Sequence, residues 1–283
     1  MNYHIPVLLH EVVEYLEIKP GEKYIDCTLG GSGHTKAILK AGGIVLGIDQ
    51  DAEALANAPK DKNLTTIQGN FAHLKDLAKK TGFTGVSGIL FDLGVSSHQL
   101  ETDYRGFSFG KDAKLDMRMD PQNQTVTAAD LVNAGAETEL ANLFWRYGEE
   151  RDSRRIAREI VSWRAGKKIE TTNELAEIIL SVSRRSPKDR THPATRVFQA
   201  LRIAVNDELA SLEAALPQAV ELLAPAGRLA VISFHSLEDR IVKNFMKENT
   251  NLTILTDKPV TPTEAEVSAN PRARSGKLRV AEK

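Results

Sequence analysis

The fold class follows from residues 24–49, which read YIDCTLGGSGHTKAILKAGGIVLGID. The apolar run at residues 24–29 predicts a short buried strand, and a glycine turn at residues 30–33 follows it. A helical pattern then runs up to a glycine pair, and residues 44–49 predict a second strand that ends on a carboxylate. A strand, a glycine turn, a helix and a strand form a βαβ unit, which predicts a parallel sheet.

The same alternation continues along the chain. Further elements are expected at residues 52–58 (helix), 64–68 (strand), 72–80 (helix), 88–92 (strand), 206–223 (helix) and 228–234 (strand). Residues 252–256 and 277–281 are the last strand candidates and are placed as an antiparallel pair at a sheet edge. The proline-rich segment between them, residues 257–276, is the most loop-like part of the chain. The expected fold class is α/β with a doubly wound, mostly parallel sheet.

Residues 105–205 interrupt this alternation. Two stretches carry apolar residues at i, i+3, i+4 and i+7, namely Leu140, Leu143, Phe144 and Tyr147, and Leu175, Ile178, Ile179 and Val182. Thr171, with a Glu three residues later, predicts a capped helix start. We therefore expect a mostly helical insert. It leaves the sheet where open α/β folds bind ligands, so its location predicts a role in gripping a substrate.

Composition narrows the class of protein. The 283 residues carry 37 Lys and Arg against 38 Asp and Glu, which excludes a polycationic nucleic-acid coat and an acidic disordered tail. A single cysteine, Cys27, excludes a disulfide or CxxC zinc site within the chain, and we expect it to be a small buried apolar residue. No apolar run approaches the length of a membrane span, and the N-terminal residues do not resemble a signal peptide. We expect a cytoplasmic protein without a membrane partner.

Acidic residues recur where predicted strands carry them toward one edge of the sheet. Asp49 lies 19 residues after Gly30, where a carboxylate can accept hydrogen bonds from both ribose hydroxyls of an adenosine. Asp26 is placed to hold the loop or a ligand amine. Asp92 ends the strand that lies beside the first in a doubly wound order. These positions predict a nucleoside site.

The glycine turn leaves the nature of the ligand open. The dinucleotide fingerprint is half present, because Lys36 stands where the third glycine would follow Gly31-Ser32-Gly33. That glycine packs a helix close beneath a pyrophosphate, so its absence favours a cofactor without phosphates, such as S-adenosylmethionine, over a nicotinamide dinucleotide. The remaining alternative is a turn that only reverses the chain, with Asp49 a solvated strand end.

Two histidines and one charged segment also have alternative interpretations. His34 is placed equally well to contact a ligand or to pack at the helix start. His235 follows the strand at residues 228–234, so a functional role and a helix cap are both open. The segment LDMRMD at residues 115–120 is more typical, from spacing alone, of a solvated helix turn.

Basic residues cluster in the insert despite the balanced net charge. Residues 151–168 hold seven basic and two acidic residues, and residues 184–202 hold six and one. Arg151, Arg154, Arg155 and Arg158 are expected to share one helical face. Phosphate contacts from such clusters would bind nucleic acid without much sequence information. The alternative is an ordinary solvated helix face.

A series of long and unusual motifs runs nearly from end to end of the chain. They are residues 4–9 (HIPVLL), 26–34 (DCTLGGSGH), 92–97 (DLGVSS), 105–109 (RGFSF), 115–120 (LDMRMD), 147–150 (YGEE), 192–196 (HPATR), 233–240 (SFHSLEDR) and 270–275 (NPRARS). On these motifs the chain resembles the bacterial 16S rRNA (cytosine-N4) methyltransferase family, RsmH (MraW). The resemblance implies a class I, Rossmann-like methyltransferase that uses S-adenosylmethionine. It also implies methylation of the exocyclic N4 of a cytidine in the decoding region (P-site) of 16S rRNA in the small ribosomal subunit.

The resemblance assigns parts of the chain to these tasks. Residues 1–104 and 206–283 would form the cofactor-binding domain, and residues 105–205 the rRNA-recognition domain. The implied cofactor contacts are Ser32, Gly33, His34, Asp49, Phe71, Asp92 and Gln99, and no metal ligand is implied. Asp92 would lie near the reacting amine or the cofactor amino group, with Ser96, Ser97, Asp116 and His235 lining the base pocket.

The chain departs from the family pattern at Ser32, where glycine is frequent, and at His98, where proline is common before Gln99. After Asp92 it also lacks the Pro-Pro-aromatic sequence of many amino-methyltransferases. Two other functions stay open from the residues alone. One is a dinucleotide-dependent oxidoreductase with a helical cap, and the other is a non-catalytic RNA-binding or assembly factor.

Overall fold

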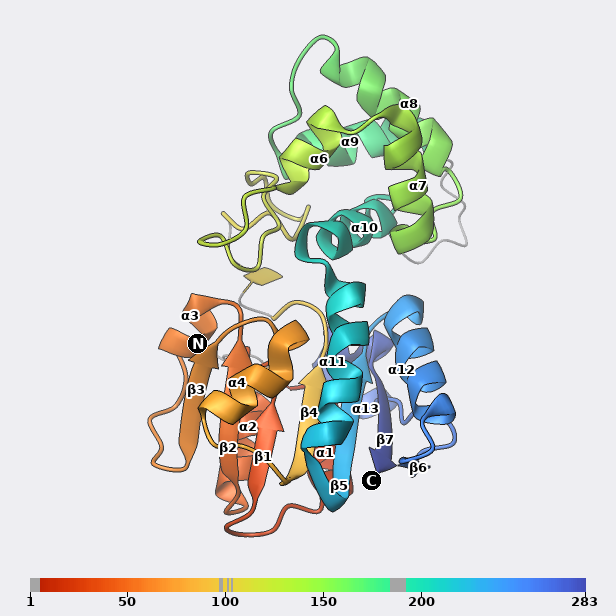
Figure 1. Ribbon diagram of the computed structural model, residues 1–283. Coiled ribbons are helices and arrows are strands. Elements are labelled where there is room, and N and C mark those ends of the chain that lie inside the picture. Colours follow the sequence, from red (N-terminus) through yellow and green to blue (C-terminus); the bar gives the residue numbers. More distant parts are fainter. Residues whose placement is uncertain (1–5, 97–98, 101, 103, 184–191) are drawn as a thin grey trace. The chain divides into compact units, whose positions relative to one another are not determined.

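The computed structural model describes residues 6–96, 99–100, 102, 104–183 and 192–283 (Figure 1). The chain forms two compact units, one comprising residues 1–97 and 209–283 and the other residues 98–208. The roles expected for these parts of the chain, cofactor binding and rRNA recognition, stay predictions.

The first unit is built on a seven-stranded sheet with the order β3-β2-β1-β4-β5-β7-β6. Its strands are β1 (Lys23–Asp26), β2 (Ile44–Asp49), β3 (Leu64–Gln68), β4 (Val86–Asp92), β5 (Leu223–Ser233), β6 (Thr253–Ile254) and β7 (Lys277–Glu282). The pairs from β3 to β5 are parallel, and β7 runs antiparallel to both β5 and β6. The predicted parallel sheet and the antiparallel pair at its edge are therefore confirmed.

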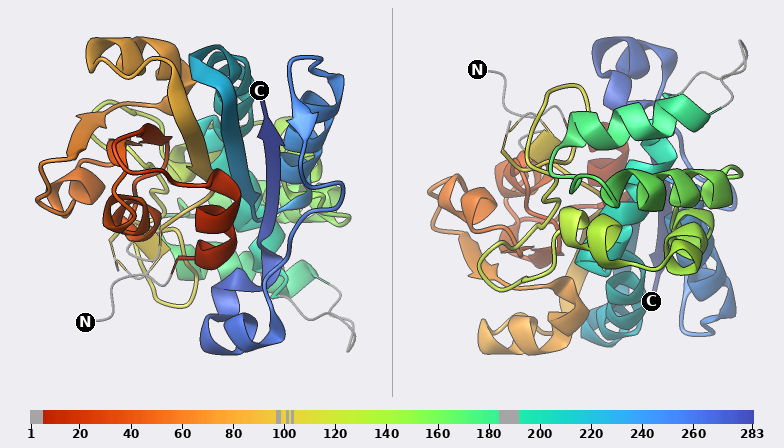
Figure 2. Two further views of the ribbon diagram at one scale, coloured as in Figure 1. Left: turned by 90° about the horizontal axis from the view of Figure 1, so that it is seen from below. Right: turned by 90° about the horizontal axis from the view of Figure 1, so that it is seen from above.

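Apolar side chains point to both faces of this sheet, and helices cover each face (Figure 2). Ile25 and Leu46 pack with α4, α11 and α12, whereas Tyr24 and Val45 pack with α1 and α2. The helices are α1 (Leu9–Leu16), α2 (Gly33–Lys40), α3 (Ala52–Ala56), α4 (Leu74–Lys80), α11 (Glu208–Leu222), α12 (Ser236–Glu248) and α13 (Glu264–Ala269), with 3-10 turns η1 (Phe71–His73) and η2 (Pro271–Ser275). Coverage of both faces explains why successive residues of β2 and β4 are buried, with no alternation of apolar and polar positions.

The segment at residues 257–276 is more ordered than its composition suggests. It contains α13 and η2, and Thr263 caps α13 by accepting a hydrogen bond from the N–H of Glu266 (3.2 Å). The Glu266 carboxylate in turn accepts from the N–H of Leu8 (2.8 Å), which ties α13 to the start of the chain. The prediction of a loop was wrong because a helix as short as α13 and a 3-10 turn such as η2 carry no apolar period.

The second unit is mostly helical, as predicted. It contains α6 (Ala128–Ala134), α7 (Glu137–Gly148), α8 (Ser153–Arg164), α9 (Thr172–Val182) and α10 (Ala194–Asn206). Thr171 accepts a hydrogen bond from the N–H of Glu174 (3.3 Å), so the predicted helix cap is present. Within the described ranges, no helix combines the length and the hydropathy that crossing a membrane requires.

Candidate functional site

Three neighbouring parallel strands end on carboxylates at one edge of the sheet. Asp26 ends β1, Asp49 ends β2 and Asp92 ends β4. The carboxyl ends of parallel strands lie at the same edge, which is where open α/β sheets bind ligands. The structure thus brings together the three acids that the sequence singled out.

Asp49 holds the glycine turn. Its Oδ2 accepts a hydrogen bond from the N–H of Gly30 (2.8 Å), and its Oδ1 accepts from the N–H of Asp51 (2.9 Å). Gly30 has φ +45°, a conformation that glycine adopts without strain. Burial raises the pKa of Asp49 to about 6, although both hydrogen bonds act to lower it. Each oxygen retains a second lone pair, so Asp49 can still accept from a ribose hydroxyl.

Asp26 fastens the end of β1 to the first turn of α2. It is 1% exposed, and its two oxygens accept from the N–H of Thr28 (3.1 Å) and from the hydroxyl of Thr35 (2.7 Å). Burial raises the pKa of this carboxyl above its ordinary value. Of the two roles open from sequence, the contacts of Asp26 are those of a residue that holds the loop.

Of the three carboxylates, Asp92 has the fewest hydrogen-bond partners among the described residues. Its Oδ1 is buried without a hydrogen-bond partner in the described structure, and its Oδ2 lies 3.5 Å from Nδ1 of His34. Burial raises the pKa of Asp92 well above its ordinary value, and the negative charges of Asp26 and Glu238 raise it further. A buried carboxylate oxygen without a partner is costly, which indicates a position that a ligand donor completes.

Ser32 has an unfavourable conformation in the turn. Its φ is +60°, it is 1% exposed, and its hydroxyl has no partner among the described residues. The next residue, Gly33, lies so close to Pro6 that a Cβ there would approach the proline ring to 2.9 Å. The glycine turn is therefore closely packed against the start of the chain.

Other predicted residues of the first unit also lie near these groups. Phe71 packs edge to face on Phe91, with ring centroids 5.5 Å apart. Ser96 lies beside the glycine turn, because its Cβ would be 3.6 Å from a Cβ placed on Gly30. Ser97 and His98 lie outside the described residues, and Gln99 belongs to the second unit.

His235 caps α12, which is one of the two roles left open from sequence. Its Nδ1 accepts from the N–H of Glu238 (3.4 Å), and its Nε2 lies 3.1 Å from Glu238 Oε1. Glu238 is 2% exposed and also accepts from the N–H of Phe234 (2.8 Å). Sequence reasoning missed Glu238, because an acid in the first turn of a helix is usually a solvated capping residue.

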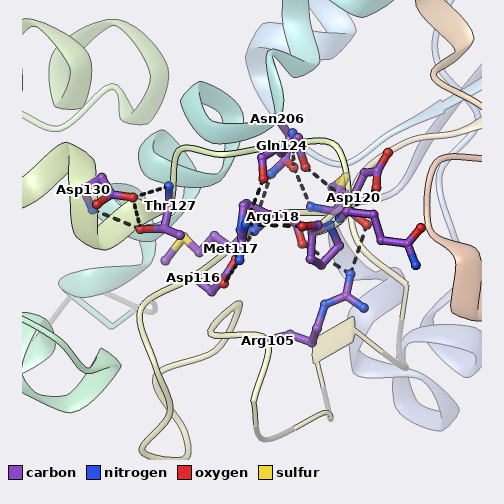
Figure 3. A network of polar contacts seen from close by, with 12 residues as sticks. Arg105, Asp116, Met117, Arg118, Asp120, Gln124, Thr127, Asp130 and Asn206 are labelled. Carbon is purple, nitrogen blue, oxygen red and sulfur yellow. Dashed lines mark hydrogen bonds and ion pairs between the residues drawn. The ribbon is translucent and has the colours of Figure 1, made fainter.

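In the second unit, Asp116 lies in an irregular loop, so the expected solvated helix turn is wrong (Figure 3). Arg118 binds both oxygens of Asp116, at 2.8 Å and 2.6 Å. Burial acts to raise the pKa of Asp116, but the hydrogen bonds and charge of Arg118 outweigh it, so the net pKa is lowered. Met117 is fully buried at φ +63° and is held by the side-chain amide of Asn206, which donates to its carbonyl (2.8 Å).

Three of the four arginines expected on one helical face, Arg154, Arg155 and Arg158, lie on α8, whereas Arg151 precedes the helix. The half-buried Arg155 pairs with Asp152 (2.9 Å). Arg154 and Arg158 are exposed, one turn apart. Most basic residues of the second run, at residues 184–191, lie outside the described ranges.

Comparisons with known proteins show the family of the chain. The model of the MraW methylase family matches residues 1–283. A protein of Trichormus variabilis named ribosomal RNA small subunit methyltransferase H is 52% identical, over 99% of this chain and 92% of its own length. One with the same name from Brevibacillus brevis is 46% identical, over 99% of this chain and 98% of its own length. A crystal structure of an rRNA methylase from Streptococcus thermophilus aligns over 99% of this chain and 98% of its own, with 12% identity and a TM-score of 0.45. The chain therefore belongs to the MraW methylase family.

Proposed function

We propose that this enzyme transfers a methyl group from S-adenosylmethionine to the exocyclic N4 of a cytidine in the decoding region (P-site) of 16S rRNA. Relatives named for methylation of small-subunit rRNA support the class of substrate. The enzyme would act in the cytoplasm on the small ribosomal subunit. The choice of cytidine N4 extends the family resemblance and is the part that most needs a test.

The observation that carries the proposal is Oδ1 of Asp92, which lies at an acidic sheet edge and has no hydrogen-bond partner among the described residues. Asp26 and Glu238 act on this carboxyl as like charges, and Asp26 also acts on Asp49. A negative field of this kind favours a cationic ligand and repels the pyrophosphate of a dinucleotide. When bound, S-adenosylmethionine supplies an electrophilic methyl group on a positively charged sulfur.

The residues implied by the resemblance fit this ligand. Asp49 would accept from the ribose, Phe71 would lie beside the adenine, and His34 and Gln99 would complete the pocket with Ser32 and Gly33.

The target amine must be activated by residues of the chain. The N4 lone pair of cytosine is delocalised into the ring, so the amine must be oriented and must donate a hydrogen bond as charge develops. We assign the acceptor of this hydrogen bond to Asp92. The base pocket would be lined by Ser96, Ser97, Asp116 and His235. Arg154 and Arg158 would contact phosphates. A base inside folded RNA would have to leave its stack to react.

The test is methyl transfer to small ribosomal subunits that lack the modification. We expect one labelled methyl per 16S rRNA, found by mass spectrometry on N4 of a decoding-region cytidine. Titration calorimetry should detect binding of S-adenosylhomocysteine and none of NAD. Binding of NAD alone would favour the oxidoreductase, and cofactor binding without transfer would favour a non-catalytic assembly factor.

A further inference from the structure

His34 is a buried histidine with a defined environment at both ring nitrogens. Its side chain is 5% exposed. Nε2 lies 3.1 Å from the carbonyl oxygen of Val7, and Nδ1 lies 3.5 Å from Oδ2 of Asp92. A carbonyl oxygen can only accept a hydrogen bond, so Nε2 must carry a proton.

This geometry requires a proton between His34 and Asp92. If the ring were neutral, Nδ1 would direct a lone pair at the Asp92 carboxylate inside a buried site, and the two groups would repel each other. A proton on either group turns the repulsion into an attraction. The pair therefore holds one proton in the folded protein.

Among the described residues, the other charged groups that act on Asp92 are acidic. Asp26 approaches from β1 and Glu238 from α12. Among the described residues, the one ion pair that Asp92 makes is with His34. His34 is therefore the group that can offset the negative charge around this carboxylate.

We propose that His34 is a positioning residue that takes the shared proton and thereby keeps Asp92 ionised as a hydrogen-bond acceptor. The donor that Asp92 meets is a nitrogen carrying hydrogen, either the ammonium of the cofactor or the exocyclic amine of the target base. This inference deepens the proposed function, and its kinetic test rests on that function.

The first test needs no substrate. Nitrogen-15 NMR of the free enzyme at pH 7 should show both ring nitrogens of His34 protonated. In Asp92→Asn, whose side chain carries no charge, Nδ1 should lose its proton while Nε2 keeps its own. An unprotonated Nδ1 in the wild-type enzyme would overturn the proposal, whether or not methyl transfer is found.

The second test is the pH dependence of His34→Gln between pH 6 and 9. Without the imidazole, Asp92 should take up a proton at a higher pH than in the wild type. Activity that needs its carboxylate should therefore begin to fall at a higher pH. The acidic limb should move upward by about one pH unit or more, with recovery toward the wild-type rate near pH 9. A decrease by the same factor at every pH would mean that His34 is only structural.

The two donors are separated by measuring S-adenosylhomocysteine affinity and kcat over the same pH range. If the cofactor ammonium is the donor, the pH profile of S-adenosylhomocysteine affinity should shift upward in His34→Gln. If the target amine is the donor, the pH profile of kcat alone should shift. A shift in neither quantity would overturn the inference. His10→Gln is the matched control, because His10 faces Glu14 at 4.0 Å on the exposed surface of α1 and should leave both profiles unchanged.

Discussion

Replacing Ser32 with glycine should stabilise the ligand-free enzyme. The left-handed backbone at φ +60° costs a non-glycine residue about 1–2 kcal/mol, and a buried hydroxyl without a partner costs about 1–3 kcal/mol. Glycine removes both costs but loses about 0.5–1 kcal/mol through the greater freedom of the unfolded chain. The net gain is about 2 kcal/mol, which in a domain of this size raises Tm by roughly 4–8 °C.

Thermal unfolding without ligand, followed by calorimetry, measures this change. Ser32→Ala is the informative companion, because it removes the hydroxyl and keeps the strained backbone. The Tm values should rise in the order wild type, Ser32→Ala, Ser32→Gly. A glycine variant that melts at or below the wild-type temperature would show that neither cost exists in the free protein.

Three further predictions concern the stability changes caused by substitutions at Asp49, Asn206 and Gly106. Because burial raises the pKa of Asp49 from 3.8 to about 6, its contribution to stability is complete below pH 3.8 and is lost as pH rises through 6. Urea unfolding from pH 4 to 7 should therefore show the wild type losing about 2 kcal/mol relative to Asp49→Asn, and parallel curves would refute this. Asn206→Ala should lower the unfolding free energy by about 3 kcal/mol and speed hydrogen exchange at residues 115–124. Asn133→Ala, which removes a half-buried amide with several hydrogen bonds, should leave that loop protected. Gly106→Ala should destabilise the second unit by more than about 3 kcal/mol, because its Cβ would lie 2.2 Å from a backbone oxygen at φ +72°. Gly110→Ala should be neutral in the same assay, because its Cβ would make only an ordinary contact with the Ser108 hydroxyl, at 3.4 Å.

The sheet was predictable because its signals are local. The strands that form the ligand edge are rich in apolar residues, and Asp49 and Asp92 were expected at strand ends. The first strand was expected over residues 24–29 with Asp26 inside it, whereas β1 ends at Asp26. Asp26, Asp49 and Asp92 could be placed together without coordinates, because parallel connections bring strand ends to one edge.

The contacts that define the site were not predictable in this way. The acid Glu238 gives the sequence pattern of a helix cap, and only its burial reveals that it acts on Asp92. The pairing of His34 with Asp92 depends on residues 58 positions apart meeting through the packing of α2 against the sheet. The loop around Asp116 was misassigned because its conformation is set by Asn206, a distant residue that sequence spacing does not connect with it.

The most direct test of the central claim is nucleoside mapping of 16S rRNA after incubation of unmodified small subunits with the enzyme and labelled S-adenosylmethionine. We expect one methyl on N4 of a decoding-region cytidine, and its loss in Asp92→Ala with the fold intact. A methyl on another atom or base, or an unchanged yield from Asp92→Ala, would contradict it.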